Sequence, residues 1–387
     1  MSRPDLNICL VGYKFMGKAH SQAWQTVDRF FDLDAQPVMK VVCGRDASAV
    51  ADFAKRWGWE QSSDDWQNAV GRKDVDLVDI SSPGNTHCEI AVAAAQAGKH
   101  VFCEKPLTFS VAESKKMLAA VREAGVQHMV NFNYRRCPAV SLARQMIDAG
   151  EIGEIRHMRC TYLQDWLVDP EFPMNWRMRS ETAGSGAHGD LGAHSIDLAR
   201  YLAGEISEVV GMKKTFIQER PAEGLSSGLT ATAGKGTEQV SVDDASVFLA
   251  KFANGALGTF EATRLAPGRK NYNRFEINGS RGSLVWCFER LNELQYYSTT
   301  DPSTKQGFRT ILATEEDHPY AGNWWPPGHM LGYEHGFTNA ASDLIQSIAN
   351  NQNCSPDFQD GAQCIAVLEA VDQSIETASW SSVETIT

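Results

Sequence analysis

The chain has 387 residues, and two domains are expected because a globular domain typically contains about 100–200 residues. Hydrophobic residues make up 43% of the chain and charged residues 22%, which is the composition of a folded protein and excludes wholesale disorder. Because the net charge is −12, the chain has no general attraction to nucleic acid or to anionic membranes, and neither is an expected partner.

No segment predicts targeting or membrane insertion. The first apolar run extends only from Ile8 to Val11, which is too short for the core of a signal peptide, and no later run approaches the ~18 residues of a membrane span. The nine cysteines are scattered and include no Cys-x-x-Cys pair. We therefore expect a cytoplasmic protein with reduced, mostly buried cysteines.

The first third of the chain alternates strand and helix patterns. Strands are predicted at Asn7–Val11, Val38–Cys43, Val75–Ile80, His100–Cys103 and Gln127–Phe132. Helices are predicted at about Met16–Phe31, Ala47–Trp57 and His87–Ala97, and from a capping box at Ser110 to Gly125. This alternation predicts an α/β domain with a parallel sheet over residues 1–132.

The pattern changes in residues 133–387, where an antiparallel sheet is predicted. Helices are predicted at Pro138–Ala149, Ala187–Leu202, about Glu334–Asn350 and Gln359–Ala378. Most of the segment from Ile206 to Ser298 is strand-like, with hairpin signals at Asn254-Gly255 and Asn278-Gly279. Residues Pro221–Gly236 are rich in Gly, Ser, Thr and Ala, and predict a mobile excursion.

A dinucleotide fingerprint follows the first predicted strand. The segment Gly12–Gly17 has G-x-G-x-x-G spacing, but Lys14 replaces the middle glycine. Gly12 would permit the tight turn and Gly17 the close packing of helix on strand, while amides at the helix start would bind a pyrophosphate. The alternative is an ordinary strand-to-helix turn. The position of Gly12–Gly17 at the first strand-to-helix turn of an alternating domain favours the dinucleotide fingerprint.

The end of the second predicted strand bears on the choice between NAD and NADP. An acidic residue at this point would bind the ribose hydroxyls and repel a 2′-phosphate, but the sequence has Gly44 followed by Arg45. NADP is therefore left open as a cofactor. Asp46 either turns inward and favours NAD or caps the helix that begins at Ala47.

Two further segments carry chemistry. Lys105, in Glu104-Lys105-Pro106, follows a predicted parallel strand at the edge where ligands bind, although a solvated lysine is the ordinary alternative. Asp190 and His194 lie four residues apart on a predicted helix, which suits a general acid/base histidine with a positioning aspartate. Surface polar residues, or a metal site that adds His188, are the alternatives; no metal is expected.

Five short motifs are spread along the chain: G-x-x-F-M-G at 12–17, Ser-Pro-x-Asn-x-His at 82–87, Glu-Lys-Pro at 104–106, Asn-Tyr-Arg at 133–135 and Gly-Asp-x-x-x-His at 189–194. With this combination the chain resembles the Gfo/Idh/MocA family of oxidoreductases over nearly its whole length. The resemblance implies a Rossmann domain over 1–132. It also implies an α/β domain over 133–387 whose open, mainly antiparallel sheet binds substrate and packs on another subunit, in a homodimer or homotetramer.

The resemblance also implies site residues. It places catalysis on Lys105, Asp190 and His194. Residues expected to bind the cofactor are Gly12, Phe15, Met16, Gly17, Arg45, Ser81, Asn85, His87, Glu104, Lys105, Trp176 and Arg177. Residues expected to face substrate are Tyr134, Gln164, Trp166, Asp190 and His194.

The implied activity is oxidation of a secondary hydroxyl on a sugar, anhydrosugar or inositol with NAD or NADP. Neutral His194 would take the hydroxyl proton, and Lys105 would stabilise the developing alkoxide. Two alternatives are a glycoside hydrolase that uses NAD without net redox change and a regulator that binds the cofactor without catalysis. The presence of both Lys105 and His194 argues against the regulator.

Overall fold

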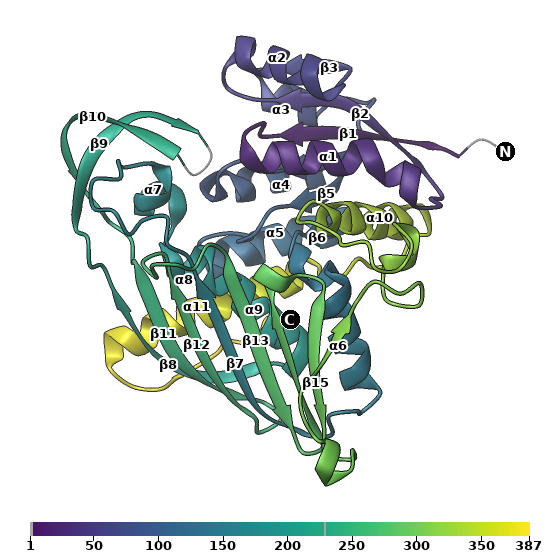
Figure 1. The fold of residues 1–387 in the computed structure, drawn as a ribbon. Helices are drawn as coiled ribbons and strands as arrows, with labels where there is room; N and C mark the ends of the chain where they lie inside the picture. Colours follow the sequence, from purple (N-terminus) through teal and green to yellow (C-terminus); the bar gives the residue numbers. More distant parts are fainter. Residues whose placement is uncertain (1–2, 228–229) are drawn as a thin grey trace. The chain divides into compact units, whose positions relative to one another are not determined.

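The computed structural model describes residues 3–227 and 230–387, and the chain forms two compact units (Figure 1). The first unit contains the chain up to Asn133, then Tyr333–Ile365 and Ile386–Thr387. The second contains Tyr134–Gly332 and Ala366–Thr385. The last third of the chain therefore contributes to both units.

The first unit is built on a six-stranded parallel sheet with the strand order β3-β2-β1-β4-β5-β6. Its strands are β1 (Asp5–Val11), β2 (Gln36–Cys43), β3 (Gln61–Ser63), β4 (Leu77–Ile80), β5 (His100–Cys103) and β6 (His128–Val130). Its helices are α1 (Phe15–Phe30), α2 (Ala47–Trp57), α3 (Trp66–Val70), α4 (His87–Gln96), α5 (Val111–Ala124) and α10 (His335–Ala349). The predicted parallel sheet is confirmed, with β3 and α3 added.

Local sequence signals define several of these helices. Asp46 accepts a hydrogen bond from the amide of Ala49 at 3.0 Å and thereby caps α2. Ser110 caps α5 in the same way, and Gly125 ends that helix in the left-handed conformation. These caps explain why the predicted bounds of α2 and α5 agree closely with the structure.

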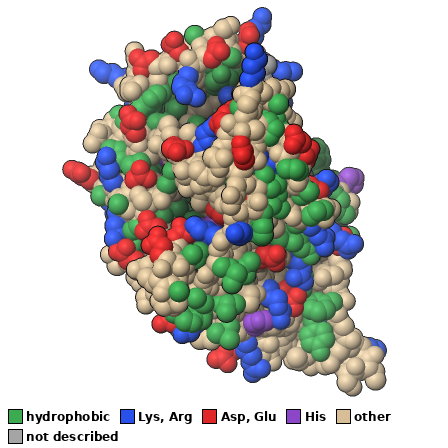
Figure 2. All heavy atoms as spheres, turned by 90° about the vertical axis from the view of Figure 1, so that its left-hand side faces the viewer, with side chains coloured by type: hydrophobic (Ala, Val, Ile, Leu, Met, Phe, Trp, Pro, Cys, Tyr) green, Lys and Arg blue, Asp and Glu red, His purple; other side chains and the backbone are tan. Residues whose placement is uncertain are grey.

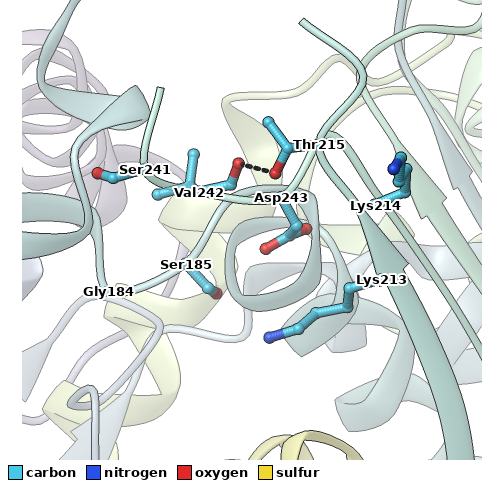
Figure 3. Close-up of a pocket in the computed structure, with 8 residues that line it drawn as sticks. All are labelled: Gly184, Ser185, Lys213, Lys214, Thr215, Ser241, Val242 and Asp243. Carbon is cyan, nitrogen blue, oxygen red and sulfur yellow. Dashed lines mark hydrogen bonds between the residues drawn. The ribbon is translucent and has the colours of Figure 1, made fainter. Parts of the chain in front are cut away.

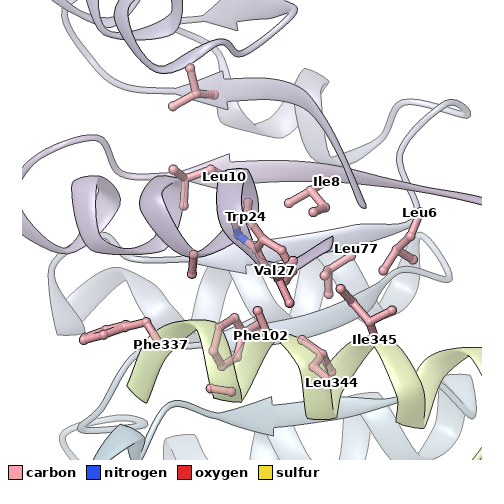
Figure 4. Packing of buried hydrophobic residues seen from close by; sticks show 14 of the residues in the cluster. Leu6, Ile8, Leu10, Trp24, Val27, Leu77, Phe102, Phe337, Leu344 and Ile345 are labelled. Carbon is pink, nitrogen blue, oxygen red and sulfur yellow. The ribbon is translucent and has the colours of Figure 1, made fainter. Parts of the chain in front are cut away.

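Helix α10 belongs to the core of the first unit although it lies more than 200 residues from α5. Figure 4 shows Phe337, Leu344 and Ile345 of α10 beside Trp24 of α1 and Phe102 of β5. All five side chains are buried. Burial of several large side chains on α1 and β5 therefore requires this late segment of the chain, which a single boundary after residue 132 does not include.

The second unit contains a nine-stranded sheet with the order β16-β15-β14-β13-β7-β12-β11-β8-β17. Its strands are β7 (Ile155–Leu163), β8 (Ile206–Lys214), β11 (Ala245–Phe252), β12 (Leu257–Thr263), β13 (Tyr272–Gly279), β14 (Gly282–Cys287), β15 (Glu293–Ser298), β16 (Arg309–Leu312) and β17 (Ser381–Ser382). Neighbouring strands are antiparallel except for β7 and β12. The mainly antiparallel sheet is therefore confirmed.

The two predicted hairpin turns differ in outcome. Asn254-Gly255 lies between β11 and β12, as predicted. Asn278 and Gly279 instead end β13, and the turn to β14 is at residues 280–281. A Cβ atom on Gly279 would lie 2.1 Å from the carbonyl oxygen of Ile152, so this glycine permits close packing rather than the turn itself.

Helices cover one face of this sheet. They are α6 (Pro138–Asp148), α8 (Ala187–Asp190), α9 (Gly192–Ala203) and part of α11 (Phe358–Thr377), and the short α7 (Ser180–Ala183) lies in a loop before α8. The helix predicted at Ala187–Leu202 is present but is interrupted at Leu191, so it forms the two helices α8 and α9. The sequence has glycines at 186, 189 and 192, which weaken a continuous helix.

The excursion predicted at Pro221–Gly236 is also corrected. Residues Glu219–Ser227 (β9) and Thr230–Gln239 (β10) form a separate two-stranded antiparallel sheet, and residues 228–229 lie outside the described residues. Arg179 forms ion pairs at 2.6 Å with Glu223 of β9 and Glu238 of β10. These pairs anchor both strands to the segment that precedes α7.

Charged and apolar groups are mixed at the surface. On the face drawn in Figure 2, Lys and Arg side chains are interspersed with Asp and Glu, and hydrophobic side chains lie in patches between them. All nine cysteines are free, and most are buried. Within residues 3–227 and 230–387, no helix is both long and apolar enough to cross a membrane.

Candidate active site

The Gly12–Gly17 turn has the close approaches that a dinucleotide fingerprint requires. Gly12 has a φ of 108°, and a Cβ atom there would lie 2.6 Å from the carbonyl carbon of Ser81. A Cβ atom on Gly17 would lie 2.3 Å from the carbonyl oxygen of Gly12. The Ser81 hydroxyl donates to that same oxygen at 2.9 Å. The turn between β1 and α1 therefore fits a pyrophosphate at the helix start.

The residues between these glycines lie at the surface. Lys14 is exposed and makes no capping hydrogen bond to α1. Phe15 is also exposed, and its ring stacks on that of Tyr333 with centroids 6.4 Å apart. Met16 is half-buried against the core of the first unit. Contact of Phe15 and Met16 with a cofactor stays a prediction.

The end of β2 explains the missing acidic residue. A Cβ atom on Gly44 would lie 2.2 Å from the ring of Tyr13, so a side chain at this position would displace that ring. The Tyr13 ring packs edge-on against Phe53 of α2. Because Asp46 caps α2, the alternative in which it turns inward does not occur here. Arg45 is exposed beside this turn.

The loop after β4 contains one exposed and one buried candidate. Asn85 is exposed. His87 is buried, with Nε2 2.9 Å from the carbonyl oxygen of Ser82 and Nδ1 3.1 Å from that of Pro106. Burial lowers the pKa of His87. The ring therefore joins the loop after β4 to the loop after β5.

Glu104 and Lys105 directly follow β5. Glu104 is buried, and its Oε2 accepts a hydrogen bond from the Lys105 amide at 3.1 Å. Its Oε1 lies 2.9 Å from Nε2 of His20. Lys105 is half-buried and precedes a cis peptide bond to Pro106. The Lys105 backbone is thus fixed by the Glu104 side chain.

In the second unit, Asp190 ends α8 and is held by a buried arginine. Arg264 Nη2 lies 2.6 Å from Asp190 Oδ2, and the Arg264 side chain is 1% exposed while that of Asp190 is 36% exposed. The guanidinium also lies 5.6 Å from the ring centroid of Trp166. An ionised Asp190 is favoured beside this cation, and one carboxylate oxygen has a fixed direction.

His194, in α9, is buried beside two tyrosines. Its ring centroid lies 4.4 Å from that of Tyr134 and 5.8 Å from that of Tyr162. The two hydroxyl groups are 2.9 Å apart, and Tyr162 donates to Asn271 Oδ1 at 2.8 Å. Tyr134 must therefore be the donor to Tyr162. Burial raises the pKa of Tyr134, which keeps its hydroxyl protonated.

The same chain of hydrogen bonds continues to the other predicted substrate residues. Gln164 donates to Asn271 at 3.0 Å, and the Trp166 indole donates to Gln164 at 2.9 Å. The structure therefore connects Tyr134, Gln164 and Trp166 through Asn271 and Tyr162. Trp166 and Gln164 remain half-buried, so they present an indole face and an amide at the surface of this unit.

Trp176 and Arg177 follow in a single 3₁₀ turn, Trp176–Met178. The Arg177 guanidinium stacks 4.3 Å from the Trp176 ring centroid, and burial lowers the pKa of Arg177. Contact of these two residues with a cofactor stays a prediction. Asp197, which shares α9 with His194, instead receives hydrogen bonds from Arg135 at 2.6 and 3.0 Å.

The structure gives no support to a metal at His188, Asp190 and His194. The His188 ring lies 2.9 Å from the Ser246 hydroxyl and 3.2 Å from the carbonyl oxygen of Leu368. Among residues 3–227 and 230–387, no group of three His, Cys, Asp or Glu side chains is arranged to hold a metal ion. His188 is better described as a buried residue that joins α8 to β11 and α11.

One pocket in the second unit lies outside the predicted site residues. It has a volume of about 250 Å³, and Figure 3 shows Thr215, Val242 and Asp243 among its lining residues. Asp243 accepts hydrogen bonds from the amides of Gly186 at 2.9 Å and His188 at 2.7 Å. Asp243 therefore fixes the start of α8, the helix that carries Asp190.

Family models match both parts of the chain. Residues 6–132 match the oxidoreductase family with an NAD-binding Rossmann fold, and residues 140–285 match the GFO/IDH/MocA C-terminal domain. The chain belongs to the Gfo/Idh/MocA family of oxidoreductases. The resemblance drawn from the five motifs is confirmed, and so is the expectation of an enzyme with a nicotinamide cofactor.

Several known proteins are similar to this chain over nearly its whole length. Levoglucosan dehydrogenase from Pseudarthrobacter phenanthrenivorans is 44% identical over 99% of both chains. A levoglucosan dehydrogenase structure in complex with NADH and levoglucosan has a TM-score of 0.94 and 44% identity over 99% of this chain and 100% of that chain. An oxidoreductase domain protein from Kribbella flavida is 52% identical, with a TM-score of 0.94, over 98% of this chain and 99% of its own.

Three residues near the predicted site were not found by sequence reasoning. Asp79 could have been noticed in the sequence, because it is the one charged residue in the otherwise apolar strand Leu77–Ile80. Arg264 and Asn271 could not be noticed in this way, because their partners are distant in the sequence. Arg264 lies 74 residues from Asp190, and Asn271 lies 107 residues from Gln164. The pairing of β7 with β13 brings Gln164 to Asn271, and the packing of α8 against β12 brings Asp190 to Arg264.

Proposed function

We propose that this chain oxidises a secondary hydroxyl group of a sugar or anhydrosugar of the levoglucosan type with NAD. The observation that carries the proposal is the similarity, over 99% of both chains, to levoglucosan dehydrogenase. The arrangement of Asp190 and His194 beside Tyr134 in one unit supports it.

The proposed roles follow from the chemistry of each side chain. His194 takes the proton of the reacting hydroxyl, because a neutral imidazole is the usual base near pH 7. Asp190, held by Arg264, accepts a hydrogen bond from a substrate hydroxyl and so fixes the ring. Lys105 supplies a cation for the developing alkoxide. When bound, the nicotinamide accepts the hydride.

Sugar recognition is assigned to the chain of groups from Trp166 to Tyr134. A pyranose has apolar C–H faces and polar edges, which suit aromatic rings and amide or hydroxyl groups respectively. Trp166 offers a flat indole face, while Gln164 and Asn271 offer polar groups whose orientations are fixed by hydrogen bonds. Preorganised donors and acceptors favour a ligand with several hydroxyl groups in fixed positions.

NAD is the cofactor that the family supports, and NADP is assigned second place. No carboxylate lies at position 44 to repel a 2′-phosphate, and Arg45 is exposed at the same turn. The proposed cofactor residues Gly12, Gly17 and Ser81 already form the turn that a pyrophosphate needs. The remaining cofactor contacts, including those of Asn85, Trp176 and Arg177, are part of the proposal.

A substrate screen tests the proposed function. Purified protein is incubated with levoglucosan, other anhydrosugars, aldoses and inositols, each with NAD and with NADP, while absorbance of the reduced cofactor is followed. We expect accumulation of reduced cofactor with an anhydrosugar or related pyranose, faster with NAD. Cleavage of a glycoside without accumulation would indicate the hydrolase instead, and no binding of either cofactor would reject the proposal.

We also propose a homo-oligomer formed through the uncovered face of the nine-stranded sheet. Met212, Val247, Leu249 and Leu257 are exposed on neighbouring strands, and Met212 pairs directly with Val247. Exposed apolar side chains so close together are typical of a subunit interface. Leu249→Arg should lower the mass measured by sedimentation, whereas Met330→Arg, an exposed site outside the sheet, should not. Equal masses for wild type and Leu249→Arg would reject this interface.

A further inference from the structure

A buried polar cluster connects α1 with the carboxyl ends of three strands in the first unit. His20 of α1 is 1% exposed, and its Nδ1 lies 2.8 Å from Asp79 Oδ1 in β4. Its Nε2 lies 2.9 Å from Glu104 Oε1, directly after β5. Asn131, after β6, donates to the same Glu104 oxygen at 2.7 Å, and Trp24 donates to Asp79 at 2.7 Å.

The geometry favours a His20 ring that is protonated on both nitrogens, with the Asn131 amide nitrogen also 3.2 Å from Nε2. Each ring nitrogen faces a carboxylate oxygen, and a neutral imidazole could donate to only one of them. The rings of Phe102 and Phe337 lie 5.2 and 5.5 Å away and cover the imidazole, so water does not replace either contact. His20 is therefore a buried imidazolium between Asp79 and Glu104.

The electrostatic balance agrees with this geometry. Burial alone lowers the pKa of His20, but the charge and hydrogen bond of Asp79, with those of Glu104, outweigh it and raise the pKa to about 10. For Glu104, burial raises the pKa, yet the His20 hydrogen bond and charge, together with Lys105, leave it below its usual value. His20 and Glu104 are therefore both charged at neutral pH.

Two hydrogen bonds lead from this cluster to Lys105. His20 and Asn131 hold one oxygen of Glu104, and the other oxygen accepts the Lys105 amide at 3.1 Å. Glu104 is therefore oriented from both sides. Because His20 lies one turn after Gly17 in α1, the same ring also connects Lys105 to the helix that begins at the dinucleotide turn.

We propose that His20 is a positioning residue, which holds Glu104 and through it the backbone of Lys105 in place relative to the start of α1. Its role for catalysis rests on the proposed function of Lys105. Replacement of a buried ion pair by an apolar core of the same volume is often neutral or stabilising, so stability alone is a weak reason for the cluster. A fixed Lys105 backbone does account for it, because catalytic groups need support from their neighbours.

The charge on His20 can be tested without turnover. We expect the ¹⁵N chemical shifts of the His20 ring, measured by NMR in the cofactor-free protein, to remain those of an imidazolium up to pH ~8.5. His100, whose pKa is lowered by burial, is the matched control and should be neutral over the same range above pH ~6.5. A neutral His20 ring at pH ~7 would overturn the proposal, whatever the enzyme's substrate.

The positioning role is tested with His20→Gln, Glu104→Gln and the double variant, with His100→Gln as the control. His20→Gln should lower kcat about 10- to 100-fold while NADH affinity, measured by fluorescence titration, stays within about threefold. The double variant should be scarcely slower than either single variant, because both changes disrupt the same chain of hydrogen bonds from His20 through Glu104 to Lys105. His100→Gln, at the other end of β5, should leave kcat unchanged.

The pH profile separates positioning from a purely structural role. Without the imidazolium, Asp79 and Glu104 share a buried site and one of them takes up a proton, so the acid limb of kcat should move up by about one pH unit or more. Loss of kcat with an unmoved limb and multiplicative effects in the double variant would overturn the proposal. If the wild type oxidised no sugar, the proposed function would fail, while the NMR result would still decide the charge.

Discussion

Asp190 forms an ion pair with the buried Arg264 beside the predicted substrate residues. A buried guanidinium at 2.6 Å gives the carboxylate one fixed direction. We expect Arg264→Met to lower kcat/KM about 10- to 150-fold, since hydrogen bonds to charged groups contribute about 1.5–3 kcal/mol. Arg264→Lys should recover only part of this loss, because an ammonium lacks the fork of the guanidinium.

The matched control for Arg264 is Arg159→Met, which removes an exposed arginine paired with Glu276 at 3.0 Å in the same sheet. Exposed pairs contribute little, so the control should change neither kcat/KM nor the midpoint of thermal unfolding appreciably. If Arg264→Met loses stability but keeps the kcat/KM of the control, Arg264 supports only the fold.

His194 and Lys105 carry the second prediction for single residues. His194→Ala should lower kcat by about 10²–10⁴-fold with NADH affinity near that of wild type, because it removes the proposed base. Lys105→Ala should behave alike, and the double variant should be scarcely worse than either single one. His157→Ala, which removes a histidine of β7 whose Nδ1 lies 3.2 Å from Asn278 Oδ1, serves as the control for general effects. Near-full turnover by either single variant would contradict the assignment.

The sequence was informative for residues whose chemistry depends on neighbours in the chain. Gly12 and Gly17 could be placed in a tight turn because that turn is local, and of the two roles left open for Asp46 the structure has the helix cap. Arg264 and Asn271 could not be assigned, since an arginine or asparagine in a strand region gives no sign of its partner. Their roles depend on strand pairing, which fixes side chains that are far apart in sequence.

Among the secondary-structure elements, α8 is held by Asp243 rather than by its own sequence. Asp243→Ala removes two hydrogen bonds to the amides of Gly186 and His188. We expect a stability loss of about 1–3 kcal/mol, measured by urea unfolding, together with a lower kcat/KM because Asp190 ends this helix. Asp46→Ala removes the cap of α2, so it should cost about 1 kcal/mol. Equal kcat/KM for both variants would show that α8 does not control Asp190.

Elements with local boundaries were predicted well, and those set by tertiary contacts were not. Helices α2 and α5 begin at capping residues and end at glycines in the left-handed conformation. The break between α8 and α9 has no such signal apart from its glycines. The β9–β10 sheet was missed because Gly, Ser and Thr predict loops, whereas here the ion pairs of Arg179 with Glu223 and Glu238 anchor both strands.

At the scale of the whole molecule, the chain order does not follow the division into units. The core of the first unit includes α10, so a fragment ending at residue 132 would expose Trp24 and Phe102, which pack against that helix. An amphipathic helix late in the chain does not reveal by its pattern which sheet it covers. The two types of sheet could be predicted from strand spacing and turns, but the unit joined by each C-terminal helix could not.

The stability of the whole molecule should depend on pH through the His20 cluster. The pKa of His20 is about 10 in the folded chain, while an unfolded histidine has a pKa of about 6.5. Below about pH 6.5 both states carry the proton and the stabilisation is complete. Above it the unfolded chain releases the proton first, so the free energy of unfolding falls as pH rises and the contribution is lost near pH 10.

Glu104 of the same cluster gives the opposite pH dependence, because its contribution to the free energy of unfolding is lost in acid. Because the pKa of Glu104 lies below its usual value in the folded chain, its contribution is present above about pH 4.5 and is lost as pH falls. The cluster should therefore stabilise the fold most between about pH 4.5 and 6.5.

Urea unfolding at pH ~6.5 and ~9.5 checks the alkaline side, and the free energy of unfolding should fall more for wild type than for His20→Gln. His100→Gln should follow wild type, because burial lowers the pKa of His100 and its titration affects only the acid side. Parallel decreases for wild type and His20→Gln would show that another group sets the alkaline limit.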